Sequence, residues 1–304
     1  MKDLIIIGAG PAGLSAAIYG IRAGIDLSVV EKFSPGGQVV NTYEVENYPG
    51  FVDPVSGWDL MSKMEAQTKR LGAEIINGDI KTIKKDADRN IFILTQTNGN
   101  IIECRSVIIA SGASFRKLGA PGEKEFLGRG VSYCATCDGA FYREKIAAVV
   151  GGGNTALEEA IFLTRFASKV YLIHRRDEFR ADKILQDRII GNSKIETILD
   201  TTVQSINGSA KVDSLLLKNK KTGNESTLIT DGVFIFVGFD PNTSIVPTEI
   251  LNDKQEVIVD MNMNTAIPGL FAAGDLRSSS KRQIVMACAD GSTAAMEAYI
   301  YLNH

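Results

Sequence analysis

The chain has 304 residues, 29 of them glycine, and a formal net charge of −3. This length suffices for two domains of ordinary size, the small net charge offers no broad electrostatic footprint for nucleic acid, and no apolar run is long enough to cross a membrane. The four cysteines, at positions 104, 134, 137 and 288, are too few for a disulfide framework or a typical exported protein. We therefore expect a cytoplasmic protein.

The first motif follows a short apolar run near the N-terminus. Residues 4–7 show no alternation, which favours a buried parallel strand over a targeting segment. Residues 8–13, Gly-Ala-Gly-Pro-Ala-Gly, fit the pattern G-x-G-x-x-G, and an alanine-rich helical stretch over 14–23 follows. Between a strand and a helix this pattern binds a dinucleotide, because its glycines allow a tight turn and bring backbone N–H groups close to a pyrophosphate.

The next apolar run, residues 27–30, ends in Glu31. An acid at this position accepts a hydrogen bond from a ribose hydroxyl and repels a 2′-phosphate, so this site should hold FAD or NAD. We expect an amphipathic helix over 58–71, short β-strands within 75–100 and a buried strand over 107–110. The glycine at 112 would again let a backbone lie close to a cofactor.

Cys134 and Cys137 form a CxxC pair, and Asp138 follows at once. Two thiols at this spacing can close a disulfide, and the adjacent acid can carry a proton. The same pair could be half of a zinc site or two structural cysteines. Zinc would need four ligands, and with no second CxxC it would have to recruit scattered residues, so we favour redox chemistry.

A second nucleotide motif follows the CxxC pair. After an apolar strand at 146–150, residues 151–156, Gly-Gly-Gly-Asn-Thr-Ala, fit G-x-G-x-x-A and lead into a helix over 157–166. The next strand, 170–173, ends in His174-Arg175-Arg176, with Arg180 one turn further. A basic cluster here accommodates a 2′-phosphate. Each charge-assisted hydrogen bond contributes about 1.5–3 kcal/mol, so two arginines predict a preference for NADPH over NADH of roughly a hundredfold or more.

The rest of the chain predicts a strand-rich region over 195–239, with a buried strand at 233–237. Residues 269–275 predict a strand that runs into a Gly-Asp turn, where the acid can meet the ribityl hydroxyls of a flavin. A small-residue helix over 284–299 closes the chain. Two glycine motifs with opposite charge at the second strand therefore predict two different dinucleotides, with the CxxC pair as the electron sink.

Taken together, these motifs resemble those of the low-molecular-weight thioredoxin reductases of bacteria and archaea, over essentially the whole chain. The resemblance rests on both glycine motifs, the CxxC segment, the basic cluster, residues 46–50 (Glu-Asn-Tyr-Pro-Gly) and residues 274–275 with 282–283. It implies an α/β fold with two Rossmann-like, three-layer ββα dinucleotide-binding domains. An NADPH domain over 115–244 would be inserted between the two segments of an FAD domain, 1–114 and 245–304. It also implies a homodimer.

The resemblance implies a path for the electrons, from NADPH through FAD and the Cys134–Cys137 disulfide to thioredoxin. Cys137 would lie nearest the flavin, Cys134 would attack thioredoxin, and Asp138 would act as general acid. A rotation of the inserted domain about crossings near 113–117 and 242–246 is expected between the two half-reactions. The implied FAD contacts are Gly8, Gly10, Pro11, Ala12, Gly13, Glu31, Gly37, Gln38, Asn47, Ile80, Gly112, Gly274, Asp275, Arg282 and Gln283. The implied NADPH contacts are Gly151, Gly153, Asn154, Thr155, Ala156, His174, Arg175, Arg176 and Arg180.

Other functions stay open at this point. A related flavoenzyme could use ferredoxin or NADH as donor, or another thioredoxin-fold acceptor, although a ferredoxin-dependent relative would be expected to lack the second glycine motif and the arginine cluster. A nucleotide-sensing or zinc-binding scaffold without turnover would be colourless when purified. Cys288 stands where the resemblance leads us to expect a small residue such as alanine, and we interpret it as a buried small hydrophobe and not a third redox centre.

Overall fold

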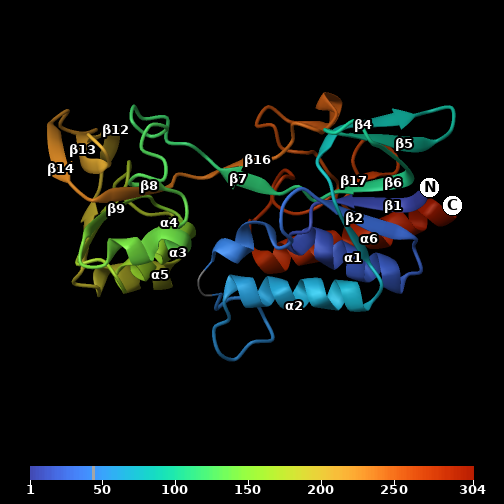
Figure 1. Ribbon diagram of the computed structural model, residues 1–304, viewed down its shortest axis with the longest axis horizontal. Helices are drawn as coiled ribbons and strands as arrows, with labels where there is room; N and C mark the ends of the chain where they lie inside the picture. The colour runs from blue at the N-terminus through green and yellow to red at the C-terminus, as the bar shows by residue number, and fades with distance from the viewer. Residues whose placement is uncertain (43–44) are drawn as a thin grey trace. The chain divides into compact units, whose positions relative to one another are not determined.

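The computed structural model describes residues 1–42 and 45–304. The chain forms two compact units, one from Met1–Ser114 with Asp240–His304 and the other from Phe115–Phe239 (Figure 1). The sequence places the second crossing at 244, whereas the second unit ends at Phe239. Strands β7 (Ala113–Phe115) and β16 (Phe239–Pro241) pair where the chain crosses. Within the described residues, no helix is both long and apolar enough to span a bilayer.

The sheet of the first unit has the strand order β3-β2-β1-β6-β5-β4, with β17 paired to β6. Strands β1, β2, β3, β6 and β17 run parallel, and β4 and β5 form an antiparallel extension. Their bounds are β1 Lys2–Ile7, β2 Leu27–Glu31, β3 Glu74–Asn77, β4 Ile80–Asp86, β5 Ile91–Gln96, β6 Ile101–Ile109 and β17 Leu270–Ala272.

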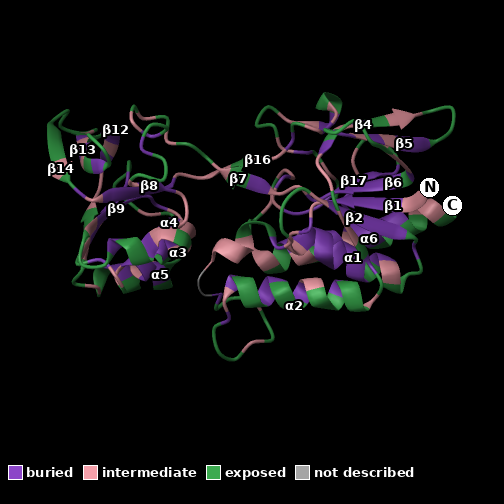
Figure 2. Cartoon of the chain, in the orientation of Figure 1, coloured by how far each residue is buried: buried purple, intermediate pink, exposed green. Residues whose placement is uncertain are grey.

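The unbroken apolar run of β1 follows from burial on both faces of this sheet. Leu4 and Ile6 pack into one core cluster with α1 (Pro11–Arg22), α2 (Gly57–Arg70) and α6 (Ile284–Asn303). Ile5 and Ile7 point the other way, into a cluster with β4, β5 and the chain after β16. Successive side chains of a strand face opposite sides, so both faces of the sheet are covered and the buried strands show in purple in Figure 2.

The second unit has the three layers expected of its fold class. Its parallel sheet has the order β11-β10-β9-β15-β8, with helices on one face and a three-stranded antiparallel sheet, β12-β13-β14, on the other. Val149 of β9 packs with the helices, and its neighbour Val150 packs with the antiparallel sheet. The bounds are β8 Val131–Ser132, α3 Ala135–Asp138, β9 Ile146–Gly151, α4 Asn154–Leu163, β10 Lys169–Ile173, α5 Lys183–Ile190, β11 Ile195–Ile198, β12 Thr201–Gly208, β13 Val212–Asn219, β14 Glu225–Ile229 and β15 Gly232–Phe236.

The short elements depart most from the sequence expectations. The sequence starts the first helix at 14 and the second motif's helix at 157, whereas α1 begins at Pro11 and α4 at Asn154. Both helices begin directly after a glycine N-cap, so the glycine motif itself belongs to the helix start. Helix α3 has four residues and α5 has eight, too few for an apolar periodicity to predict them. Short helices η1 (Gly37–Asn41), η2 (Gly139–Tyr142) and η3 (Thr248–Ile250) were also not expected.

Candidate active site: two glycine-rich loops and a CxxC disulfide

The first glycine loop connects β1 to α1 and leaves no space for a side chain at Gly8 or Gly13. Gly8 has φ +105°, and a Cβ atom there would overlap Ala110 O at the end of β6. A Cβ on Gly13 would overlap Gly8 O. Gly10 is the N-cap of α1, and Pro11 takes the first helical position, where its missing N–H costs nothing. The N–H groups of this turn are thereby held at the carboxyl end of the sheet.

Glu31 braces this loop from the end of β2. Its Oε2 accepts a hydrogen bond from Ala9 N at 2.7 Å, and Oε1 accepts one from Phe33 N at 2.9 Å. An ionised carboxylate has about four acceptor sites, so two backbone donors leave capacity for ribose hydroxyls. The acid that the sequence assigned to the ribose therefore also fixes the shape of the glycine loop.

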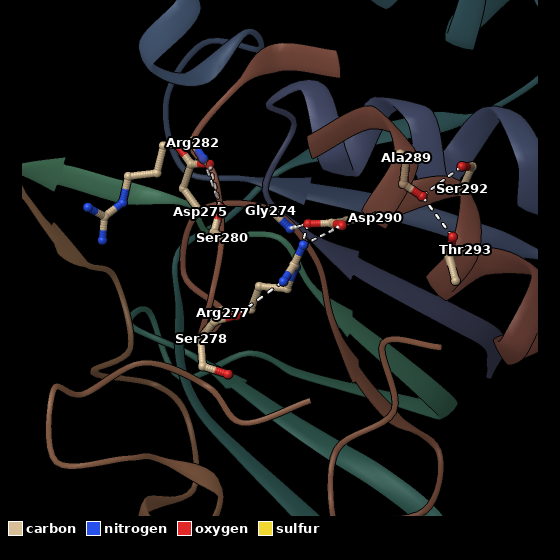
Figure 3. Close-up of polar contacts among 10 residues, drawn as sticks. All are labelled: Gly274, Asp275, Arg277, Ser278, Ser280, Arg282, Ala289, Asp290, Ser292 and Thr293. Atoms are coloured by element: carbon tan, nitrogen blue, oxygen red, sulfur yellow. Dashed lines mark hydrogen bonds and ion pairs between the residues drawn. The ribbon is translucent and has the colours of Figure 1, made fainter. Parts of the chain in front are cut away.

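A second turn meets the first loop from the C-terminal part of the chain. Gly274, with φ +87°, follows β17, and a Cβ on it would lie 3.0 Å from Ala12 Cβ. Asp275 accepts a hydrogen bond from Ser280 Oγ at 3.3 Å (Figure 3). Burial raises the pKa of Asp275. A half-buried acid therefore follows directly after the glycine that lies against Ala12 of α1, and its contact with the ribityl hydroxyls stays a prediction.

The Gly274–Asp275 turn is held by an ion pair that sequence reasoning missed. Asp290 of α6 accepts Gly274 N at 3.1 Å and binds Arg277 through Nε at 2.6 Å and Nη2 at 2.8 Å (Figure 3). Both side chains are largely buried. Sixteen residues separate Gly274 from Asp290, so only the folded chain brings them together.

The remaining residues of the first predicted set surround these loops. A Cβ on Gly10 would lie 3.9 Å from Gly37 Cα, and Asn47 Nδ2 donates to Gln283 Oε1 at 3.0 Å. Gly112 has φ +65° and open space at its Cβ position. The other members are Gln38 in η1, Arg282 just before α6 and Ile80 at the start of β4. The Ile80 side chain is buried in the apolar core, so its backbone is the part able to reach a cofactor.

The second glycine loop connects β9 to α4 in the other unit. A Cβ on Gly151 would lie 2.5 Å from both Ala156 Cβ and Phe236 O, so the glycine allows helix and sheet to meet closely. A Cβ on Gly152 would overlap the imidazole of His174, the residue directly after β10, so this ring lies against the loop. Gly153 is the N-cap of α4, with open space at its Cβ position.

The predicted basic cluster gathers beside this loop. Arg180 N donates to Gly152 O at 2.7 Å, which ties the segment after β10 to the glycine turn. His174 is 5% exposed, and its Nε2 atom has no hydrogen-bond partner among the described residues. Burial lowers the pKa of His174, and the charges of Arg180 and Arg176 lower it further. Arg175, Arg176 and Arg180 have exposed side chains.

Asn154 has a structural partner of its own. Its Nδ2 donates to Asp182 Oδ2 at 2.7 Å, and its Oδ1 accepts Asp182 N at 2.9 Å. This reciprocal pair joins the start of α4 to the start of α5, because Asp182 is the N-cap of α5. Thr155, the next predicted contact, lies in the first turn of α4 and is half-buried.

The CxxC pair is closed as a disulfide at the start of α3. The Cys134 and Cys137 Cα atoms are 5.4 Å apart, and Cys134 Sγ accepts a hydrogen bond from Cys137 N at 3.1 Å. Cys137 is exposed and Cys134 is half-buried. Hydrogen bonding to a sulfur favours its thiolate form, so this geometry favours a thiolate on Cys134 in the reduced state.

Two buried polar groups hold the chain next to the disulfide. Tyr133 Oη donates to Glu123 Oε1 at 2.5 Å, and the Glu123 carboxylate also accepts Leu118 N and Gly119 N. Ser132 Oγ accepts Cys134 N at 3.0 Å. The backbone immediately before the disulfide is therefore fixed by side chains that carry no motif signature.

Asp138, the predicted general acid, ends α3 and is half-buried. Its negative charge is the second cause, after burial, of the raised pKa of Tyr142, about 12. Cys288 is half-buried in α6. Its Sγ donates to Pro11 O at 3.8 Å and lies 3.8 Å from Tyr48 Oη, which donates to it, so it packs against the first glycine loop.

The two loops fit dinucleotides, and they fit different ones. The first is a backbone cradle with Glu31 behind it and Asp275 beside it. The second presents a buried imidazole nitrogen that has no partner in the described part of the chain, next to arginine charges. An unpartnered buried polar atom is costly, and a phosphate oxygen would satisfy it. Among the described residues, no cluster of three or more His, Cys, Asp or Glu could hold a metal ion.

The sequence model of the family described as pyridine nucleotide-disulphide oxidoreductase matches residues 2–291. The thioredoxin reductase of Listeria innocua is 48% identical over 99% of this chain and 94% of its own length. The solved thioredoxin reductase of Lactococcus lactis has 42% identity and a TM-score of 0.97, over 100% of this chain and 99% of that one. A ferredoxin-flavin thioredoxin reductase of Clostridium acetobutylicum has 33% identity and a TM-score of 0.55, over 99% and 97%.

Proposed function

The chain belongs to the pyridine nucleotide-disulphide oxidoreductase family, among its thioredoxin reductases, and on this basis we propose that its electron donor is NADPH. FAD and NADPH are the cofactors of this family. We assign FAD to the unit of Met1–Ser114 and Asp240–His304, and NADPH to the unit of Phe115–Phe239. The chemistry supplied by the bound cofactors is the transfer of two electrons from the nicotinamide through the flavin to the disulfide.

The environment of His174 is the observation that supports NADPH as the donor. Its buried Nε2 has no partner in the described chain, and the charges of Arg176 and Arg180 act on it. Together with Arg175, these side chains would hold a 2′-phosphate, which NADH lacks. The glycine loop beside them would hold the pyrophosphate on the first turn of α4.

The residues of α3 would carry the exchange with thioredoxin. Reduction adds two electrons and two protons to the Cys134–Cys137 bond and gives two thiols. Cys134 gives its proton to the Asp138 carboxylate, its thiolate attacks the thioredoxin disulfide to form a mixed disulfide, and Asp138 passes that proton to the leaving sulfur. Cys137 finally attacks the Cys134 sulfur and its own proton goes to the departing thioredoxin sulfur, which restores the internal disulfide and releases reduced thioredoxin.

Steady-state rates with three donors test this proposal. The FAD-loaded protein should reduce thioredoxin with NADPH far faster than with NADH, and reduced ferredoxin should support little turnover. Ferredoxin-driven turnover that exceeds the NADPH rate would reject NADPH as the donor. A colourless protein that binds zinc, and that reduces thioredoxin with none of the three donors, would reject the enzyme assignment itself.

We also propose that the chain forms a homodimer and works in the cytoplasm. Supporting the dimer, α6 carries exposed apolar side chains along much of its length, and Tyr19 of the adjacent α1 is exposed as well. These α6 residues are Val285, Met286, Met296, Tyr299 and Ile300. Light scattering during gel filtration should give twice the chain mass, and Met296→Glu with Ile300→Lys should shift it toward the monomer. A monomeric parent protein would reject the dimer.

A further inference from the structure

A buried carboxyl group contacts the first residue of α3, directly after Cys134 in the chain, and no motif points to it. Glu159 on α4 is 9% exposed. The backbone N–H of Ala135, the first residue of α3, donates a hydrogen bond to its carboxyl. Its Oε2 atom has no partner among the described residues. One residue further along α3, Thr136 Oγ1 is also buried without a partner.

The surroundings of Glu159 favour its neutral form. The core cluster around it is apolar, with side chains such as Ala156, Ala160, Leu163 and Ala135. Within the described chain Glu159 forms no ion pair, and the charge acting on it is that of Glu158, which is negative. A buried carboxylate with one donor and a like-charged neighbour is penalised. Burial and Glu158 accordingly raise the pKa of Glu159 to about 8.

The other elements packed against α4 bring few charges toward this position. Strands β9 and β15 carry no titratable side chain. Helix α3 and η2 contribute Asp138 and Tyr142, and Tyr142 has a pKa of about 12. The charged or titratable residues of α5 and β10 are Lys183, Asp187, Arg188, Lys169 and Tyr171, of which Lys183 pairs with Asp187, and Lys169 with Glu196 of β11.

We propose that Glu159 is a positioning residue for the dithiol: from the apolar core it anchors the start of α3, and in its neutral form it does so without opposing a thiolate on Cys134. A carboxylate in the same place would put a second negative charge one hydrogen bond away from the backbone of the residue that follows Cys134. Ionisation of Glu159 and of the Cys134 thiol would then oppose each other, and the two groups would titrate as a coupled pair. Ionisation of Glu159 thereby shifts the formation of the Cys134 thiolate, and with it the reactivity of Cys134, to higher pH. This rests on the proposed role of Cys134 as the attacking thiol.

The test is the pH profile of Cys134 alkylation by iodoacetamide in the FAD-loaded protein with Cys137→Ser, which leaves Cys134 as a permanent thiol. Glu159→Gln is added because it keeps the size and a carbonyl acceptor for Ala135 N–H but cannot ionise. Mass spectrometry separates Cys134 from Cys104 and Cys288. Glu158→Gln is the matched control, since it removes the same charge from an exposed position on the same helix.

We expect the Glu159→Gln profile to follow a one-proton curve and to superimpose on its parent at pH 6–7. Above pH 8 the parent should lag, by about twofold or more near pH 9, because its carboxylate opposes the thiolate. The Glu158→Gln profile should stay closer to the parent. Superimposed profiles at every pH, or a rate ratio that is constant with pH, would overturn the proposal, since a structural role alone gives a pH-independent change.

A second measurement keeps the proposal testable if Glu159→Gln does not fold. NMR of the oxidised, FAD-loaded parent, labelled with ¹³C at the glutamate side-chain carboxyl, should show one glutamate that ionises near pH 8. Glutamate labelling excludes Asp275, whose pKa is also raised. If all glutamates ionised below pH 6, the proposed role of Glu159 would be rejected. Failure of the donor assignment would show instead as absent NADPH turnover, with the alkylation profiles unchanged.

Discussion

Arg277 and Asp290 form a two-point ion pair, with Nε–Oδ2 at 2.6 Å and Nη2–Oδ1 at 2.8 Å, and their side chains are 11% and 6% exposed. Asp290 Oδ2 also accepts a hydrogen bond from Gly274 N at 3.1 Å. The pair therefore joins α6 to the turn that presents Asp275 beside the first glycine loop. Two planar groups that meet in this way fix an orientation as well as a distance.

Asp290→Asn should destabilise the first unit and weaken its hold on FAD. The substitution leaves the buried Arg277 charge without a counter-charge, and loss of one partner of a buried pair costs about 3–5 kcal/mol. Urea unfolding measures the stability, and flavin absorbance after gel filtration measures FAD occupancy. Asp3→Asn breaks the exposed Asp3–Arg105 pair and serves as control, with an expected loss below about 1 kcal/mol. Equal losses in the two variants would contradict the structural role of Asp290.

Gly152→Ala should raise the KM for NADPH without releasing FAD. A methyl group at this position overlaps the His174 imidazole, so the ring must move out of the site. We expect a rise of roughly tenfold or more, about 1.4 kcal/mol of lost binding. Gly191→Ala, at the C-cap of α5 with ordinary van der Waals space, is the control. An unchanged KM in Gly152→Ala would mean that His174 does not contribute to the coenzyme site.

Arg175→Ala combined with Arg176→Ala should separate the two nicotinamide coenzymes. The 2′-phosphate is the group that these guanidinium charges would bind. The KM for NADPH should therefore rise by roughly a hundredfold or more, whereas the KM for NADH should change little. Steady-state kinetics with both coenzymes measures this. A matching loss for NADH would show that the cluster does not recognise the 2′-phosphate.

The buried His174 predicts a loss of stability in mild acid. Its pKa in the folded chain lies below the ordinary value of about 6.5, so below pH 6.5 the unfolded chain takes up a proton that the folded chain does not. The free energy of unfolding should fall as the pH drops, by up to about 1.4 kcal/mol per pH unit, until the folded pKa is reached. Urea unfolding of His174→Gln should lack this component, and His304→Gln, at the exposed C-terminal residue, should retain it. A His174→Gln slope equal to the parent's would contradict the shift.

Sequence reasoning succeeded where the signal is local. The glycine motifs lie between a strand and a helix, and Gly8 and Gly13 have no room for a side chain, so short patterns encode them directly. The unbroken apolar run of β1 predicted a buried parallel strand and that of β9 predicted a strand, and both strands are buried on both faces. The CxxC spacing predicted a pair that can close within one turn, and the disulfide is closed.

Sequence reasoning failed where the partners lie far apart in the chain. Asp290 and Gly274, Tyr133 and Glu123, and Glu159 and Ala135 come together only in the folded chain. One charged residue among many gives no sign that it will be buried. Asp290 and Glu159 could have been suspected because each follows small or apolar residues on one helix face. Their partners are set by tertiary packing alone.

An anaerobic titration of the FAD-loaded protein with NADPH, followed by flavin absorbance, tests the central claim most directly. Bleaching should be complete at near-stoichiometric NADPH and should reverse when oxidised thioredoxin is added. NADH at the same concentration should bleach the flavin much more slowly. In the Cys134→Ser variant NADPH should still bleach the flavin, but thioredoxin should not restore it. The account would be contradicted if neither coenzyme bleached the flavin and reduced ferredoxin bleached it.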